Sequence, residues 1–265
     1  MNGHFRVAAV LVSAVLSSAA DAQDPAEKTP RVQLLVPAYF YPAGDGAKEW
    51  DKLLAAADRA AIVAIVNPAS GPGRRVDPNY TAVLERAAKS KRLTLIGYVS
   101  TSYAKRPLEQ VKADVDQWLK FYPGIHGIFF DEQASGAEQV EYYAALYKHV
   151  RETHKLKLVI TNPGTACAEG YVSKPAADAV CLFEGPRPFD AAKLPEWRAR
   201  YAADRIAVLS YQIKTAEAMQ KLIAAAAEAK IGLCYITDDE GGNPWDRLPK
   251  YWEEEVAAAE MANGQ

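Results

Sequence analysis

The chain has 265 residues and a net charge of −2, from 31 Lys and Arg against 33 Asp and Glu. A charge this close to zero sets up no field that would attract nucleic acid or an anionic membrane. We therefore exclude nucleic-acid-binding and membrane-surface proteins, and we expect a neutral or small partner.

The first 22 residues have the composition of a cleavable export signal. Arg6 supplies a positive charge, residues 7–15 form an apolar run, and Ala20 to Ala22 form a small-residue cleavage pattern. A membrane anchor would need roughly 18 apolar residues, which this run does not reach. We expect this signal peptide to be followed by a short tail over residues 23–30, and the mature chain to be secreted or periplasmic, free of the membrane and monomeric.

The rest of the chain alternates short apolar runs with Ala-rich amphipathic stretches, which is typical of βα units. We expect strands over residues 32–40, 61–68, 93–99, 126–132, 157–163, 178–184, 205–212 and 231–239. We expect helices over residues 48–59, 79–91, 107–120, 137–153, 190–203, 215–229 and 247–262, and a short one within 165–177. Eight such units in one domain over residues 31–265 predict a (β/α)8 barrel, in preference to an open α/β sheet.

The active site of a (β/α)8 barrel lies at the carboxyl ends of its strands. In this sequence those ends are rich in carboxylates, amides and tyrosines, whereas the amino ends carry mainly Lys, Arg and Ala. The polar or aromatic residues at the carboxyl ends are Tyr39, Tyr41, Asn67, Tyr98, Thr101, Asp131, Glu132, Asn162, Glu184, Tyr211, Gln212, Asp238 and Asp239. As substrate-binding residues we predict Tyr39, Tyr41, Asn67, Tyr98, Asn162, Tyr211, Asp238 and Trp245.

The four histidines argue against a catalytic metal. His4 lies in the signal, His126 opens a strand at the wrong end, and His149 and His154 fall in or just past a helix. A His-ligated catalytic metal or a Ser-His triad is therefore not expected, and neither a GxSxG elbow nor a phosphate-binding loop is present. We predict no cofactor and no metal. The acidic run at 238–240 is interpreted as a solvated loop, with a weak cation site as the alternative.

What remains at the strand ends is carboxylates with aromatic and amide partners, which is the composition of a sugar site. Asp131 and Glu132 are adjacent, and crowded carboxylates separate their pKa values, so that one can stay protonated as an acid while its neighbour is ionised. Either could instead cap the helix near residue 137. Glu184 ends a buried strand, where an unpaired charge is unfavourable, and its presence there therefore indicates a function. We predict Asp131, Glu132 and Glu184 as the catalytic carboxylates.

Three cysteines lie in the mature chain: Cys167, Cys181 and Cys234. An odd number leaves at least one unpaired in an exported protein. Cys181 and Cys234 sit inside apolar runs, which favours buried free thiols, although a Cys167–Cys181 bridge is possible.

Six ordered motifs resemble one known family. They are PAYFYP (37–42), AIVNPASGPG (64–73), GYVSTSYAKR (97–106), GIFFDE (127–132), NPG (162–164) and FEGP (183–186). Together they resemble the spherulin-4-like proteins, classed as glycoside hydrolase family 135. The resemblance implies a (β/α)8 glycosidase that acts on microbial exopolysaccharide. The characterised members of the family are endo-acting enzymes that cleave α-1,4-linked N-acetylgalactosamine. It also implies that the conserved acids are Asp131, Glu132 and Glu184.

Three functions compete on this barrel. The first is an exported endo-glycosidase, the second a non-catalytic glycan-binding protein, and the third a structural role in a coat or matrix. The presence of all three acids favours the enzyme, because a lectin needs stacking and hydroxyl contacts but no protonated carboxyl group.

Overall fold

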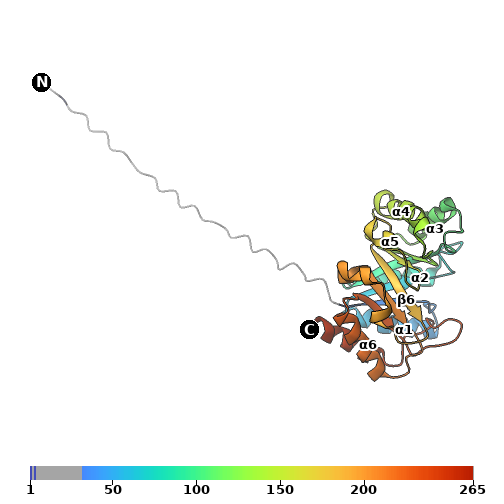
Figure 1. The fold of residues 1–265 in the computed structure, drawn as a ribbon. Coiled ribbons are helices and arrows are strands. Elements are labelled where there is room, and N and C mark those ends of the chain that lie inside the picture. Colours follow the sequence, from blue (N-terminus) through green and yellow to red (C-terminus); the bar gives the residue numbers. More distant parts are fainter. Residues whose placement is uncertain (2, 4–31, 265) are drawn as a thin grey trace.

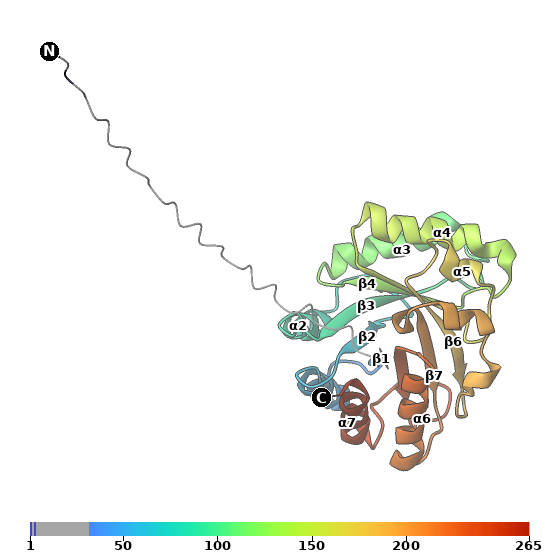
Figure 2. The same cartoon turned by 60° about the vertical axis from the view of Figure 1, so that its left-hand side comes forward.

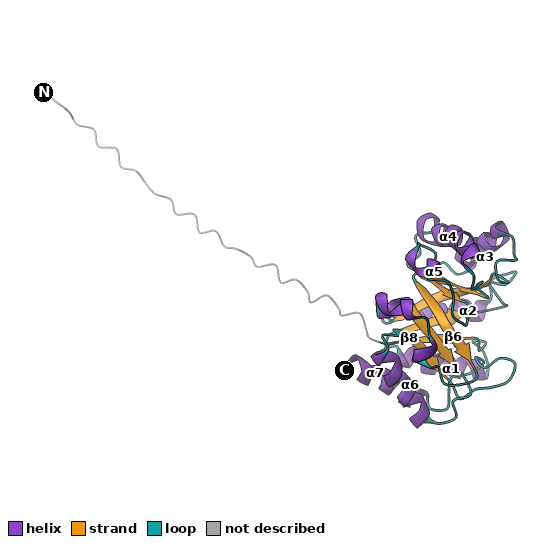
Figure 3. Ribbon diagram, viewed as in Figure 1, coloured by secondary structure: helices purple, strands orange, loops and turns teal. Residues whose placement is uncertain are grey.

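The apolar runs of the sequence form eight parallel strands that close into a barrel in the order β1 to β8. The computed structural model describes residues 1, 3 and 32–264. The strands span Gln33–Ala38 (β1), Ile62–Val66 (β2), Leu93–Ser100 (β3), Gly127–Asp131 (β4), Leu158–Asn162 (β5), Ala179–Gly185 (β6), Ile206–Ser210 (β7) and Leu233–Ile236 (β8). The strands occupy the centre of the molecule and helices surround them (Figure 1 and Figure 3). The (β/α)8 prediction is confirmed, whereas the predicted signal peptide and tail lie outside the described residues.

The barrel is closed by a short parallel ladder between its first and last strands. Gln33 pairs with Leu233 and Leu34 with Cys234. Almost every strand residue is buried, as expected where one face of a sheet packs in the barrel interior and the other against helices. This burial explains why the strands are continuous apolar runs in the sequence.

In the described part of the chain, seven α-helices surround the strands (Figure 2). They span Asp45–Ala56 (α1), Pro78–Ala87 (α2), Leu108–Phe121 (α3), Val140–Lys148 (α4), Gly170–Ser173 (α5), Ala216–Glu228 (α6) and Trp252–Asn263 (α7). Shorter segments are the 3₁₀ turns Ala137–Gln139 (η1), Ala191–Lys193 (η3), Glu196–Arg200 (η4) and Ala203–Arg205 (η5), and the π-helical turn His149–Thr153 (η2). None of the helices in the described part of the chain is long and apolar enough to span a membrane.

Three helix predictions are wrong in part, and proline accounts for two of them. The helix expected over 190–203 is replaced by 3₁₀ turns, because Pro195 forces Leu194 into an extended conformation with ψ 153°. The helix expected over 247–262 begins only at Trp252, beyond Pro249. The helix expected over 137–153 is regular only in α4 and continues as the π-helical η2.

The three cysteines are buried free thiols, which confirms the prediction for Cys181 and Cys234 and shows that Cys167 and Cys181 are not bridged. Burial raises the pKa of Cys167 to about 12 and raises that of Cys181 and Cys234 further. These thiols are therefore protonated and unreactive at neutral pH.

Candidate active site

Asp131 and Glu132 stand where β4 meets the barrel mouth. Asp131 is the last residue of the strand, and Glu132 follows it with a left-handed backbone (φ 54°). The next helical turn, η1, has Gly136 at its N-cap and no side-chain cap. Neither acid caps that turn, so the capping alternative is wrong, and the strained backbone at Glu132 directs the two adjacent carboxylates differently.

One amide connects the acids of two different strands. Asn162 ends β5 directly beside Asp131 in the sheet register. Its Nδ2 donates to Asp131 Oδ1 at 2.8 Å and to Glu184 Oε2 at 2.6 Å. Because both oxygens bond to one nitrogen, they lie at most about 5.4 Å apart, the sum of these two distances. Asp131 and Glu184 therefore face one another across the end of β5.

Burial sets the protonation of this pair. The pKa of Asp131 is raised chiefly by burial, opposed by hydrogen bonds from the Glu132 backbone, Tyr98 and Asn162. The pKa of Glu184 is also raised chiefly by burial, and further by the charge of Asp131, while Asn162 and the Trp245 indole oppose the rise. The pair therefore holds a proton to higher pH than isolated carboxyl groups would.

Two tyrosines form the wall beneath Asp131. The Tyr98 hydroxyl donates to Asp131 Oδ2 at 2.9 Å, so both oxygens of this carboxylate are fixed by protein donors. Tyr39 meets the Tyr98 ring edge to face, with ring centroids 5.8 Å apart. Burial and the nearby Asp131 charge raise the pKa of both phenols well above the usual range. Tyr98 therefore stays a hydrogen-bond donor to Asp131.

Glu132 is held by the last residue of β3 and by the loop that follows it. Ser100 and Ser102 both donate to Glu132 Oε2, the second at 3.3 Å. The Thr101 hydroxyl donates to the Glu132 carbonyl at 2.8 Å, and the Tyr103 N–H donates to the same carbonyl at 2.7 Å. The third acid is thus fixed by a separate set of donors from those that hold Asp131 and Glu184.

These groups open into a cleft of about 310 Å³ at the carboxyl end of the barrel. The residues that line it are Tyr103, Asp131, Glu132, Asn162, Pro163, Gly164, Glu184 and Tyr211. Tyr211 packs edge to face on the buried Trp245, with ring centroids 5.6 Å apart. The cleft therefore combines three carboxylates with an aromatic wall, the combination that binds and cleaves sugars.

Three predicted binding residues have other partners in the structure. The Tyr41 hydroxyl bonds to Asp77 Oδ2 at 3.0 Å beside the start of α2, and Asn67 Oδ1 accepts from the Gly71 N–H at 2.9 Å. Asp238 Oδ1 accepts from Arg247 at 2.8 Å. None of these three lines the cleft, and neither do Tyr39, Tyr98 and Trp245, so that of the predicted binding residues Asn162 and Tyr211 line it.

The solvated-loop interpretation of residues 238–240 is wrong for its first two residues. Asp238 and Asp239 are buried, and both pair with the guanidinium of Arg247, at 2.8 and 3.0 Å. Both carboxylates therefore belong to an ion pair that connects the chain after β8 to the segment before α7. Glu240 is exposed, as expected, and pairs with Lys214.

Sequence reasoning missed the part of the site that comes from loops. Ser100, Ser102 and Tyr103 contact or flank Glu132, and Gly164 (φ 64°) lies against Glu184. A run of hydroxyl residues directly after a strand was the available signal. The left-handed backbone of residues Ser102 to Ala104, which turns this loop over the cleft, could not be predicted from the sequence.

Two solved structures share this barrel. Aspergillus clavatus Sph3, solved in complex with GalNAc, matches with a TM-score of 0.75 and 25% identity, covering 87% of this chain and 98% of that chain. The catalytic domain of a Pyrococcus furiosus chitinase matches with a TM-score of 0.54 and 15% identity over 89% of this chain, a likeness of fold alone. The barrel, the carboxylate cleft and the match to Sph3 together support a glycan-acting enzyme of the glycoside hydrolase type.

The family is shown by the sequence. The model of the spherulation-specific family 4 (Spherulin4) matches residues 33–259, and the chain belongs to this family. Spherulin-4 of Physarum polycephalum is 29% identical over 243 residues, which cover 88% of this chain and 71% of that protein. The resemblance inferred from the six motifs is confirmed.

Proposed function

We propose that this chain is an exported glycoside hydrolase that cuts a microbial exopolysaccharide internally, at α-1,4-linked N-acetylgalactosamine or galactosamine. The observation that carries the proposal is the Asn162 bridge, which holds Asp131 and Glu184 within about 5.4 Å of each other across an open cleft. Two carboxyl groups about 5–5.5 Å apart are what a retaining glycosidase needs.

Asp131 is assigned as the nucleophile and Glu184 as the acid and base. Burial raises the pKa of both acids, but Asp131 accepts from two side chains, Tyr98 and Asn162, which stabilise its ionised form, and its charge further favours a proton on Glu184. Glu184 protonates the leaving oxygen while Asp131 attacks the anomeric carbon from the opposite face. Glu184 then removes a proton from the water that releases the sugar from Asp131.

Retention at the proposed linkage requires this nucleophile from the protein. In an α-linked N-acetylgalactosamine the acetamido group lies on the same face as the leaving oxygen, so it cannot attack from behind. A retaining mechanism therefore needs an enzyme carboxylate for this attack, and Asp131 is placed for it. The choice of sugar is supported by the GalNAc bound to Sph3, and the Tyr211 ring on the cleft wall offers a face for stacking.

The alternative of a lectin or matrix protein predicts binding without turnover. A lectin gains nothing from two carboxylates kept close together in a partly buried site, because that arrangement costs stability. The cleft therefore favours the enzyme.

The test is to incubate the mature chain with defined galactosamine-containing, glucosamine-containing and neutral polysaccharides and to identify released oligosaccharides by mass. We expect oligosaccharides from the galactosamine polymers only. Glu184→Gln and Asp131→Asn should each lower turnover by about 10² to 10⁴ or more, with Tm within a few degrees of wild type. Glu132→Gln should have a milder effect if Glu132 only tunes its neighbour.

Glu240→Gln is the matched control, since it removes an exposed carboxylate after β8 that lies outside the cleft. It should leave turnover unchanged. Binding of the polysaccharide with no product from the wild-type chain would replace the enzyme proposal with the lectin.

A further inference from the structure

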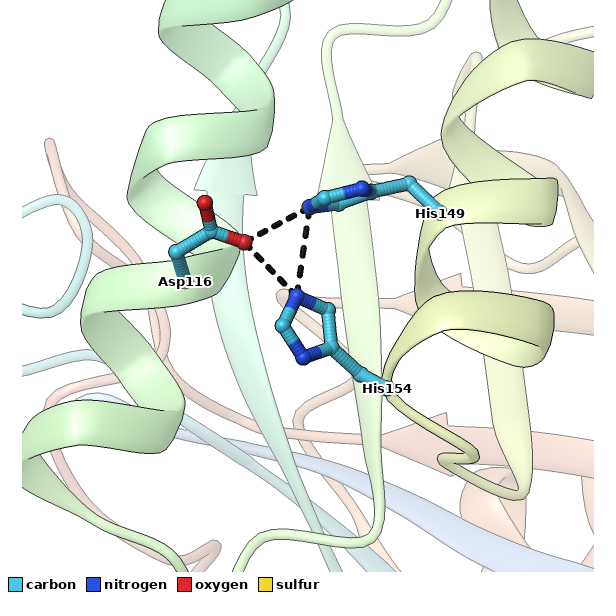
Figure 4. A group of neighbouring side chains, drawn as sticks. All are labelled: Asp116, His149 and His154. Atoms are coloured by element: carbon cyan, nitrogen blue, oxygen red, sulfur yellow. Dashed lines mark hydrogen bonds and ion pairs between the residues drawn. The ribbon is translucent and has the colours of Figure 1, made fainter.

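A second cluster of side chains that could bind a ligand, one aspartate and two histidines, lies on the outside of the barrel, away from the cleft. Asp116 is on α3, His149 opens the π-helical turn η2, and His154 follows that turn directly. Asp116 Oδ1 lies 2.7 Å from His149 Nε2 and 2.6 Å from His154 Nε2 (Figure 4). The two Nε2 atoms are 3.2 Å apart. All three side chains thus direct one ligand atom each at a common point.

The π-helical turn is what brings the two histidines together. Residues five apart on a regular α-helix are about 140° apart around the axis and cannot share a ligand. In η2 the His154 N–H instead bonds to the His149 carbonyl five residues back, at 3.2 Å. This wider turn places both imidazoles on the side that faces α3. Such turns cost hydrogen-bond geometry and are found frequently at functional sites.

The arrangement of ring nitrogens is that of a ligand set. The tautomer of each ring decides whether its Nε2 donates a hydrogen to Asp116 Oδ1 or presents a lone pair, and the two Nε2 atoms lie only 3.2 Å apart. With the protons on Nδ1, both Nε2 lone pairs and the carboxylate oxygen converge without a donor among them. A cation supplies the missing positive charge.

We propose that Asp116, His149 and His154 bind a divalent first-row transition metal of the Zn²⁺ type. The triangle with sides of 2.6, 2.7 and 3.2 Å has its corners about 1.7 Å from a common centre. A tetrahedral zinc with bonds of about 2.05 Å needs ligand atoms about 3.3 Å apart, so the 3.2 Å N···N edge already fits, whereas the two N···O edges of 2.6 and 2.7 Å have to open by about 0.7 Å on binding. Two imidazoles and one carboxylate are ligands that zinc accepts, and the fourth position faces solvent.

The site joins neighbouring parts of the barrel wall. Helices α3 and α4 lie side by side on the outer surface (Figure 1 and Figure 2), and η2 continues α4. The side chains of His149 and His154 are 16% and 22% exposed, whereas that of Asp116 is 54% exposed, so the ion enters from the α3 side. A bound metal links two elements that are more than thirty residues apart in sequence and stabilises the folded state. This inference is independent of the proposed glycosidase activity.

The experiment uses the untagged chain, freed of metal with a chelator and titrated with Co²⁺ and then Zn²⁺. We expect one equivalent of Co²⁺ to produce the visible absorption of a low-coordinate cobalt centre, and Zn²⁺ to displace it. Zinc at a hundredfold excess over Kd should raise Tm by about 5 °C or more. In His149→Gln, His154→Gln and Asp116→Asn the metal affinity should fall about tenfold or more, and the Tm increase at the same zinc concentration should fall to about half or less.

Glu152→Gln is the matched control, because Glu152 lies between the two histidines in sequence, is exposed, and is absent from the ligand set. It should bind cobalt and zinc as wild type does. The proposal is overturned if wild-type protein gives no cobalt absorption, or if the His149→Gln, His154→Gln double variant binds both metals unchanged. Cobalt bound without any Tm increase from zinc would overturn the stabilising role alone.

Discussion

Asn162 is the residue on which the geometry of the candidate site depends. Its side chain is almost fully buried, and its single Nδ2 serves both Asp131 and Glu184. An amide is suited to this position because it donates two hydrogens without adding a charge. A lysine there would ion-pair with both acids and lower both pKa values.

Replacing Asn162 should therefore damage the chemical step more than substrate binding. We expect Asn162→Ala to lower kcat by about 10- to 10³-fold with little change in KM, because the carboxylates lose a shared donor that orients them. Steady-state kinetics on a defined oligosaccharide measure the split. Asn79→Ala removes an exposed amide near α2 and serves as the control. A kcat that is unchanged in Asn162→Ala would show that the bridge has no role in turnover.

Glu184 should make the protein less stable as the pH rises. Its folded-state pKa is raised, chiefly by burial, above the value of the unfolded chain. The folded state therefore binds the proton more tightly, and the stability that this confers is present below about pH 4.3 and lost as the pH rises through the folded pKa. Glu184→Gln removes the titration. Thermal unfolding should show Tm of the variant above wild type at pH 8, with the difference shrinking towards pH 4. A difference independent of pH would contradict the burial argument.

The carboxylates and Asn162 could be predicted from the sequence because each ends a buried strand, and strand ends of a barrel meet at one rim. The direction that each side chain takes beyond its strand end could not be predicted in the same way. Tyr41 and Asn67 satisfy nearby loop and helix groups, and Asp238 pairs with Arg247, which comes from a segment without regular structure. Such pairings depend on loop conformations that no hydrophobic periodicity encodes.

At the scale of elements, the contact between β3 and α3 depends on a glycine. The Trp118 ring of α3 packs flat on Gly97, where a Cβ would come within 2.6 Å of the ring, and Trp118 Nε1 donates to the Tyr98 carbonyl at 2.8 Å. This packing fixes the strand that carries Tyr98 and leads into the Ser100 loop.

Gly97→Ala should destabilise the fold by about 1–3 kcal/mol, since neither the buried ring nor the strand can move without losing contacts. Equilibrium urea unfolding measures the change. In Gly124→Ala, a Cβ has no heavy atom within 4 Å and the backbone needs no left-handed conformation, so its stability should match wild type. Equal stability of the Gly97→Ala and Gly124→Ala variants would mean that α3 shifts freely on the sheet.

The π-helical turn η2 could not be predicted from the hydrophobic periodicity of the sequence. Amphipathic spacing located α4 but assumed 3.6 residues per turn throughout, under which His149 and His154 point apart. Their convergence on Asp116 requires the wider turn. The sequence therefore excluded a metal from the catalytic rim but contained no signal for a cluster on the helical layer.

For the whole molecule, the barrel could be predicted because eight separate apolar runs, each followed by a helix or turn, have few other ways to bury both strand faces. The weak points were the segments after β6 and β8, where prolines interrupt the helical pattern. The barrel tolerates these irregular connections because the backbone hydrogen bonds that close it join neighbouring strands and do not involve the surrounding helices.

Barrel closure also sets the stereochemistry that we predict. Asp131 ends β4 and Glu184 lies near the end of β6, so one strand, β5, separates them, and their backbones stand roughly 10 Å apart at about 4.8 Å per strand. The side chains lean inward over Asn162, which brings their nearest bonded oxygens to within about 5.4 Å. This upper bound on the oxygen separation lies nearer the about 5–5.5 Å of retaining enzymes than the about 6.5–9.5 Å that leaves room for the water of inversion. We therefore expect retention: proton NMR during hydrolysis of an α-linked substrate should show the α-anomer first, with the β-anomer appearing only by mutarotation. An initial β-anomer would mean inversion and would remove Asp131 from the role of nucleophile.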